Sequence, residues 1–214
     1  MIIIAFFYLL RPGEYTSSPS DTQPFDYKSV QLFCGGRRFD LTTASHAEIL
    51  TATFASLTFE LQKNGVRGEV IGQGLSGHPD VCQVKALARR VIHVRQFYAP
   101  PTNPLAMAYV RDAWMPITPS QISKTIKQAV TFLGPELGLL PSEVSARCLR
   151  AAGANALLNA KVDPNIISLL GRWKSDTMFR YSSVQSSTLM SDYSQRMPRH
   201  GDYVLIPNQL VPMH

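Results

Sequence analysis

Apolar residues form a continuous run at the start of the chain. Residues 2–10 are almost wholly apolar and Pro12-Gly13 follow them, which predicts a buried helix, with a loop from Pro12 to Tyr27. The run is too short to span a bilayer, and it lacks the flanking features of a signal peptide. The abrupt start inside a predicted core suggests that an upstream segment is missing or belongs to another part of a longer gene product.

Farther along, two stretches rich in apolar and β-branched residues predict antiparallel hairpins. In the first, Val30–Phe33 and Arg37–Leu41 flank a Gly-Gly pair. In the second, Phe54–Leu61 and Val66–Ile71 flank Asn64-Gly65, a pair that favours tight turns between strands. These strands indicate a small antiparallel sheet.

The remainder of the chain is mainly helical in its pattern. Thr118-Pro119-Ser120-Gln121 combines a capping box with proline at the first helical position and opens a helix to about Phe132. Helical spacing and cap residues predict further helices at 81–94, 145–160 and 164–170, and another that Ser175 caps. The element order indicates an α+β single domain over residues 1–190, followed by a C-terminal tail at 191–214.

Composition adds a localised positive charge to this picture. The chain has 214 residues, of which 45% are hydrophobic and 17% charged, so extensive disorder is excluded. The net charge is +6, but residues 85–181 carry +8 and residues 1–84 carry −2. Such an excess attracts phosphates and predicts salt-sensitive binding to a polyanion. The three cysteines are far apart and no zinc-type spacing occurs, which indicates reduced thiols in an intracellular protein.

Four scattered pieces carry the candidate chemistry. Taken singly, each piece has a structural interpretation that involves no catalysis. In chain order these interpretations are a helix-capping arginine with a salt-bridged glutamate, a solvated turn lysine, a surface arginine pair and a half-buried core tyrosine. In chain order the pieces are Leu10–Glu14 (LRPGE), Phe59–Gly65 (FELQKNG), Arg147–Ala154 (RCLRAAGA), and Leu169–Asp176 (LLGRWKSD) with Tyr181.

Together, these pieces resemble the catalytic domain of the tyrosine recombinase (phage integrase) family over roughly residues 2–185. The most specific stretch is 149–181, LRAAGANALLNAKVDPNIISLLGRWKSDTMFRY, which is similar to the second conserved box of Crypton-type eukaryotic mobile elements. Tyr181 follows Arg150 by 31 residues and Arg172 by 9, which fits that box. QKNGVRGE at 62–69 resembles the lysine hairpin of those elements. The resemblance implies the mainly helical recombinase catalytic fold, without the N-terminal domain that clamps DNA.

The resemblance also implies a metal-independent reaction without a cofactor. Tyr181 would attack the scissile phosphate, form a 3′-phosphotyrosyl bond and release a 5′-hydroxyl, so that the strand can later be rejoined. Arg11 and Arg150 map onto the phosphate clamp, a role that suits a permanent charge with paired donors. Lys63 maps onto the acid that protonates the leaving oxygen. Arg172 occupies the position where His or Trp usually donates to a phosphate oxygen.

Arg147 is the main departure from the family pattern, which most often has His at this position. Arginine cannot act as a general base at neutral pH, so Arg147 would instead hold the phosphate or lower the pKa of the tyrosine. The alternative is that this copy of a mobile element is decayed. Glu14 matches the acidic residue that follows the first arginine, with a structural role. Tyr193 and Tyr203 are the fallback nucleophiles. Further candidate contacts with DNA are Lys124, Lys127, Trp173 and Lys174.

The expected partner is double-stranded DNA, in a nuclear setting and with no membrane. The family resemblance further implies self-association on DNA, as a synaptic tetramer. Two alternatives stay open: a catalytically inactive DNA-binding module derived from such an enzyme, and an unrelated helical DNA-binding or scaffold protein.

Overall fold

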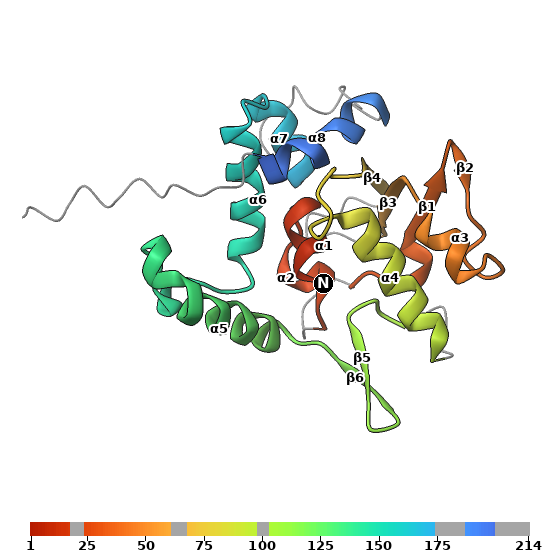
Figure 1. The fold of residues 1–214 in the computed structure, drawn as a ribbon, viewed down its shortest axis with the longest axis horizontal. Coiled ribbons are helices and arrows are strands. Elements are labelled where there is room, and N and C mark those ends of the chain that lie inside the picture. Colours follow the sequence, from red (N-terminus) through yellow and green to blue (C-terminus); the bar gives the residue numbers. More distant parts are fainter. Residues whose placement is uncertain (18–23, 61–67, 98–102, 174–186, 200–214) are drawn as a thin grey trace, which may run out of the picture.

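The computed structural model describes residues 1–17, 24–60, 68–97, 103–173 and 187–199 (Figure 1). These residues form a mixed α+β fold, and about half of them are helical. The helices are α1 (Ile2–Phe7), α2 (Pro12–Tyr15), α3 (His46–Leu50), α4 (Gln83–Gln96), α5 (Pro119–Leu137), α6 (Cys148–Asn159), α7 (Pro164–Gly171) and α8 (Ser187–Arg199), with short 3₁₀ turns at Tyr27–Ser29 and Pro141–Glu143. The strands are β1 (Val30–Cys34), β2 (Arg37–Arg38), β3 (Phe54–Phe59), β4 (Glu69–Gly74), β5 (Met107–Val110) and β6 (Ala113–Pro116).

An antiparallel sheet with strand order β2-β1-β3-β4 contains both hairpins that the sequence predicts. The β3–β4 pairing ends where Phe59 faces Glu69, and the Gly68 N–H donates to the Phe59 carbonyl at 2.8 Å. This hydrogen bond lies at the base of the connection between β3 and β4, which contains Lys63. A separate hairpin, β5–β6, has no counterpart among the predicted elements.

The core forms around α1, which packs against α4 on one side and α6 on the other (Figure 1). Ile4 and Phe7 of α1 are fully buried, as the apolar opening run predicts. Helix α4 also contacts the strands of the main sheet, and α8 packs along β4. The approach of α1 to α6 is close, because a Cβ at Gly153 would lie 2.3 Å from the Phe6 carbonyl oxygen.

Two expectations about local structure are wrong. Pro12–Tyr15 is a short helix, not a loop, because Pro12 at its first position and Glu14 at its third stabilise a helix start. Helix α8 continues to Arg199, so residues 191–199 are not an irregular tail; Tyr193 and Met197, one turn apart, are both buried. The predicted helix carrying Tyr181 lies outside the described residues.

No helix within the described ranges has the length and apolar character that crossing a membrane requires.

Candidate functional site

Arg11 and Glu14 form a capped turn at the start of α2. Arg11 is the N-cap residue, and its backbone N–H donates to Glu14 Oε2 at 2.7 Å. Arg11 Nη1 also donates to Glu14 Oε1 at 3.0 Å, which makes an ion pair. The Arg11 side chain is 26% exposed, whereas that of Glu14 is only 3% exposed. The turn therefore directs the carboxylate into the protein and leaves part of the guanidinium at the surface.

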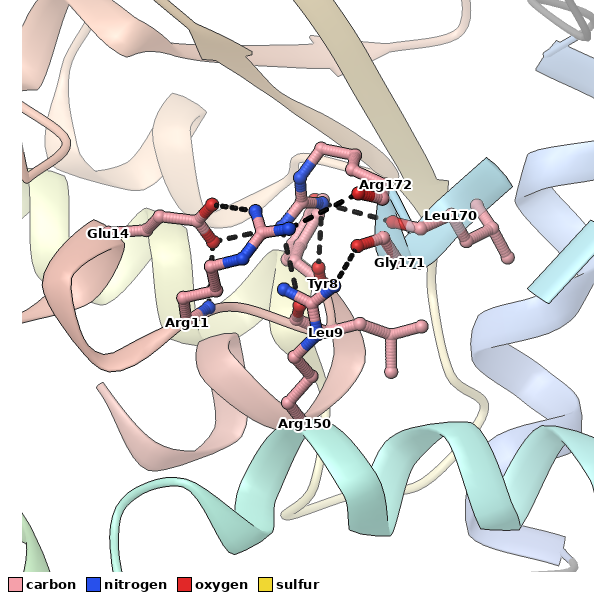
Figure 2. Close-up of polar contacts among 8 residues, drawn as sticks. All are labelled: Tyr8, Leu9, Arg11, Glu14, Arg150, Leu170, Gly171 and Arg172. Carbon is pink, nitrogen blue, oxygen red and sulfur yellow. Dashed lines mark hydrogen bonds and ion pairs between the residues drawn. The ribbon is translucent and has the colours of Figure 1, made fainter. Parts of the chain in front are cut away.

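Arg172 ends α7, and its side chain is buried against the first two helices (Figure 2). Its Nη2 donates to Glu14 Oε2 at 2.9 Å and to the Leu9 carbonyl at 3.3 Å. Its Nη1 donates to the Tyr8 carbonyl at 3.2 Å and to the Leu170 carbonyl at 3.0 Å. Each Nη therefore uses both of its protons on protein acceptors, and the remaining donor, Nε, is buried without a hydrogen-bond partner among the described residues. In this arrangement Arg172 offers no free Nη to a ligand, unlike the role that the resemblance implies.

Arg150 reaches the same place from α6. Its Nη2 donates to the Gly171 carbonyl, and its Cζ lies 4.3 Å from the ring centroid of Trp173. Arg11 Nη2 donates to the next carbonyl, that of Arg172, at 3.2 Å. Arg150 and Arg11 thus hold two carbonyls that the end of α7 leaves without helical partners. Arg150 Nη1 is buried and has no hydrogen-bond partner among the described residues.

Arg11, Arg150 and Arg172 form a group of like charges that we call the arginine cluster (Figure 2). Burial, Arg11 and Arg172 together lower the pKa of Arg150 to about 10. Burial also lowers the pKa of Arg172, while the carboxylates of Glu14 and Glu69 oppose that shift. An oxyanion beside Arg150 Nη1 would satisfy a buried donor and reduce the repulsion between the guanidinium groups. The cluster is therefore chemically suited to hold a phosphate group.

Positive charge continues from the cluster toward α5. Arg147 is the exposed N-cap residue of α6 and lies one turn before Arg150. Ser123 Oγ in α5 accepts a hydrogen bond at 3.0 Å from the backbone N–H of the residue before Arg147, which brings α5 beside this end of α6. Lys124 and Lys127, on the same part of α5, are both exposed. Trp173, the fourth candidate near this surface, is 39% exposed and covers Arg150.

Three candidates, Lys63, Lys174 and Tyr181, lie outside the described residues. Lys63 follows Phe59 by four residues, a length of chain that spans at most about 14 Å. Tyr181 follows Trp173 by eight residues, which span at most about 28 Å. Chain length therefore permits both side chains to approach the cluster, and that approach stays a prediction.

The fallback nucleophiles are less favourable or lie outside the described chain. Tyr193 in α8 is only 7% exposed. Tyr203 falls beyond the described residues.

The structure adds two kinds of group that sequence reasoning missed. The Phe59 ring lies 3.8 Å from Arg172 Cζ and is 3% exposed. In the sequence, Phe59 could have been noticed as the last apolar residue of the strand that precedes the connection with Lys63. The carbonyls of Tyr8 and Leu9 also bind Arg172, and backbone acceptors leave no mark in a sequence.

No family model matches the chain, and no curated protein or solved structure is similar to it at a significant level.

Proposed function

We propose that the chain is the catalytic domain of a metal-independent DNA breaking-and-rejoining enzyme, with the fold of tyrosine recombinases. Such an enzyme would act in recombination or in the integration of a mobile element. The observation that carries this proposal is the arginine cluster, in which Arg11 contacts Arg172 across 161 positions of sequence and Arg150 joins them. Three motifs chosen for their resemblance to one catalytic site thus meet at one place.

The cluster supports the role of a phosphate clamp. Arg11 is partly exposed, and Arg150 Nη1 is a buried donor without a partner in the described part of the chain. A phosphorane-like transition state gains negative charge, so fixed cations stabilise it more than they stabilise the starting diester. Burial strengthens this effect because water screens the charges less.

In the proposed reaction, the Tyr181 oxygen attacks phosphorus and the bond from phosphorus to the 5′-oxygen breaks. The leaving oxygen keeps the bonding electrons and takes a proton from the Lys63 ammonium, while the phenol proton passes to solvent. A phenol has an ordinary pKa near 10, so the cations around the phosphate would assist its ionisation. Rejoining reverses these steps with another 5′-hydroxyl.

A second candidate function is a DNA-binding module that has lost catalysis. Arg147 favours it, because an exposed arginine in place of the usual His supplies charge for a phosphate but no base. Both candidates have double-stranded DNA as partner. Self-association on DNA and a nuclear location belong to the same proposal.

The two functions differ in whether a covalent adduct forms. The chain is incubated with a pool of nicked duplexes whose central positions are randomised, because the target site is part of the question. Denaturing electrophoresis then separates covalent adducts from bound DNA. The enzyme proposal expects adducts that Tyr181→Phe abolishes without loss of DNA binding.

Binding without an adduct in any member of the pool favours the inactive module. Arg147→His then tests decay at that position, because a restored histidine supplies the missing base. If neither the unmodified protein nor Arg147→His binds the DNA pool, both the enzyme and the DNA-binding module are wrong.

A further inference from the structure

We propose that the indole of Trp173 is a movable cover over Arg150, which a phosphate must displace before it binds the arginine cluster. This inference rests on the proposed function, because it concerns the regulation of the same site. With the indole in place, the phosphate clamp is closed.

The arginine cluster keeps its unpaired donors away from solvent. Arg150 Nη1 and Arg172 Nε are both buried without a hydrogen-bond partner among the described residues. The Arg172 side chain is 1% exposed and lies against the carbonyls of Tyr8 and Leu9 and the ring of Phe59. A ligand oxygen reaches a buried donor only when a group that covers it moves. A phosphate clamp at this place therefore needs a movable part.

Trp173 is a surface residue that lies over Arg150. The Cζ atom of Arg150 is 4.3 Å from the centroid of the Trp173 ring, and Trp173 is 39% exposed. The ring lies flat against Gly171, where a Cβ would overlap with it. The indole thus occupies a space that the absence of a side chain at Gly171 provides. Its contact with the guanidinium is a cation–π contact at the edge of the solvent, which is a weak interaction.

Only the side chain of Trp173 has to move to uncover Arg150. The backbone N–H of Trp173 donates to the Ser168 carbonyl at 3.0 Å, which holds the main chain at the end of α7. Arg150 Nη2 donates to the Gly171 carbonyl, so the guanidinium keeps its place when the indole leaves. Rotation about the side-chain bonds of a partly exposed residue is fast and requires no unfolding.

A phosphate oxygen interacts more strongly with Arg150 than the indole does. It accepts charge-assisted hydrogen bonds, whereas the indole offers only the face of its ring. It also reduces repulsion within the cluster, where burial, Arg11 and Arg172 together lower the pKa of Arg150 to about 10. Displacing the indole still costs free energy, which weakens the binding of a single free phosphate. A duplex with further contacts overcomes this cost, so the cover favours the phosphates of bound DNA.

Two substitutions open the cover in different ways. Trp173→Ala removes the indole. Gly171→Ala keeps it, but the new Cβ overlaps with the ring and pushes it aside, while the carbonyl that holds Arg150 remains. Gly171 ends α7 without a positive φ, so alanine fits its backbone.

We expect both variants to bind inorganic phosphate about 5-fold more tightly than the unmodified protein, because the anion no longer has to displace a cation–π contact. Arg150→Met should lose this binding. Trp114→Phe, which changes the other tryptophan of the chain, should bind phosphate as the unmodified protein does. Titration followed by ³¹P nuclear magnetic resonance measures all four affinities.

The movement itself can be measured through the fluorescence of the indole. Trp114→Phe leaves Trp173 as the single tryptophan of the chain. In this background, phosphate should increase the quenching of Trp173 by acrylamide, and potassium chloride at the same ionic strength should not. Adding Gly171→Ala should give the increased quenching without phosphate, and adding Arg150→Met should abolish the response to phosphate.

The outcomes separate this inference from the proposed function. If Arg150→Met loses phosphate binding but Trp173→Ala binds no more tightly than the unmodified protein, the cover is wrong while the phosphate clamp stands. Gly171→Ala decides in the same way if Trp173→Ala does not fold. Quenching that phosphate leaves unchanged would also overturn the cover. If phosphate does not bind, or binds Arg150→Met equally well, the phosphate clamp is wrong and the cover with it.

Discussion

Two non-glycine residues at the arginine cluster have left-handed backbone conformations, Leu9 with φ 50° and Arg172 with φ 56°. Each such residue costs roughly 1–2 kcal/mol. Arg172 Nη2 donates to the Leu9 carbonyl, so one hydrogen bond joins the two strained positions. Strain of this kind persists only where surrounding contacts compensate it. The bonds that hold the cluster also stabilise its backbone.

This arrangement makes a stability prediction for position 172. Arg172→Ala removes the side-chain bonds and keeps the left-handed strain, whereas Arg172→Gly removes both. We expect the glycine variant to lower the free energy of unfolding by about 2 kcal/mol, through loss of a buried ion pair whose partner Glu14 keeps Arg11. The alanine variant should be less stable by about 1 kcal/mol more. Urea denaturation measures both, and an alanine variant equal to or more stable than glycine would contradict the account.

His93 gives a prediction of how the free energy of unfolding depends on pH. Its ring lies edge-on to Phe97 and Trp114, at 5.2 and 5.9 Å between centroids. Burial, with a further contribution from Arg90, lowers the pKa of His93 below its ordinary value of 6.5. Because the folded pKa is the lower one, protonation favours the unfolded state, and the free energy of unfolding falls as the pH drops below 6.5. His93→Gln should lack this part of the pH dependence in urea denaturation. Identical profiles for the two proteins would show that the prediction is wrong.

At the scale of elements, the packing of α1 on α6 brings Arg11 and Arg150 together. Gly153 allows this packing, because a Cβ there would lie 2.3 Å from the Phe6 carbonyl oxygen and 2.5 Å from Leu9 Cδ2. Neither atom can yield easily, since one belongs to the backbone and the other to a fully buried side chain. The spacing of the two helices therefore depends on a residue that contacts no ligand.

Gly153→Ala should therefore destabilise the protein although alanine is the better helix former. We expect overpacking to outweigh the propensity gain of about 1 kcal/mol and to leave a net loss of about 1–2 kcal/mol. Asn155→Ala, at an exposed position of the same helix, should be neutral or slightly stabilising. Thermal denaturation of both variants checks this, and a Gly153→Ala protein as stable as Asn155→Ala would contradict the close packing.

The elements differ in how far the sequence alone could predict them. The β3–β4 pairing and α5 have strong local signals in the sequence, an Asn64-Gly65 pair that favours turns and a capping box at Thr118, and both were predicted. The β5–β6 hairpin turns through Arg111 and Asp112, both with positive φ, where no glycine marks the turn. Helix α8 was missed because its buried residues contact the main body of the fold, which a local pattern does not reveal.

Across the whole molecule, the site depends on contacts between distant segments. The motifs could be read in sequence, and the structure brings Arg11, Arg150 and Arg172 together. The pairing of Glu14 with Arg172 spans 158 positions, and Arg172 stands where the resemblance leads us to expect His or Trp. No local pattern could predict that pairing.

Under the proposed function, the exposed positive charges around α6 are expected to contact duplex DNA. Arg147→Ala and Lys127→Ala should each weaken binding and reduce the slope of log affinity against log salt by about 1, because each phosphate contact releases counterions. Arg38→Ala removes the same charge from β2, in the part of the chain with no net positive charge, and should leave the slope unchanged. Fluorescence anisotropy over a salt series measures all three, and equal effects would indicate binding without a defined basic surface.

Identifying the residue that becomes linked to DNA tests the proposed reaction most directly. Covalent adducts from the nicked-duplex pool are digested with nuclease and protease, and mass spectrometry locates the nucleotide remnant. We expect one peptide, with a 3′-phosphate nucleotide on Tyr181, and we expect Arg150→Met to lose it. Attachment at Tyr193 or Tyr203, or binding of the pool with no linked peptide, would contradict it.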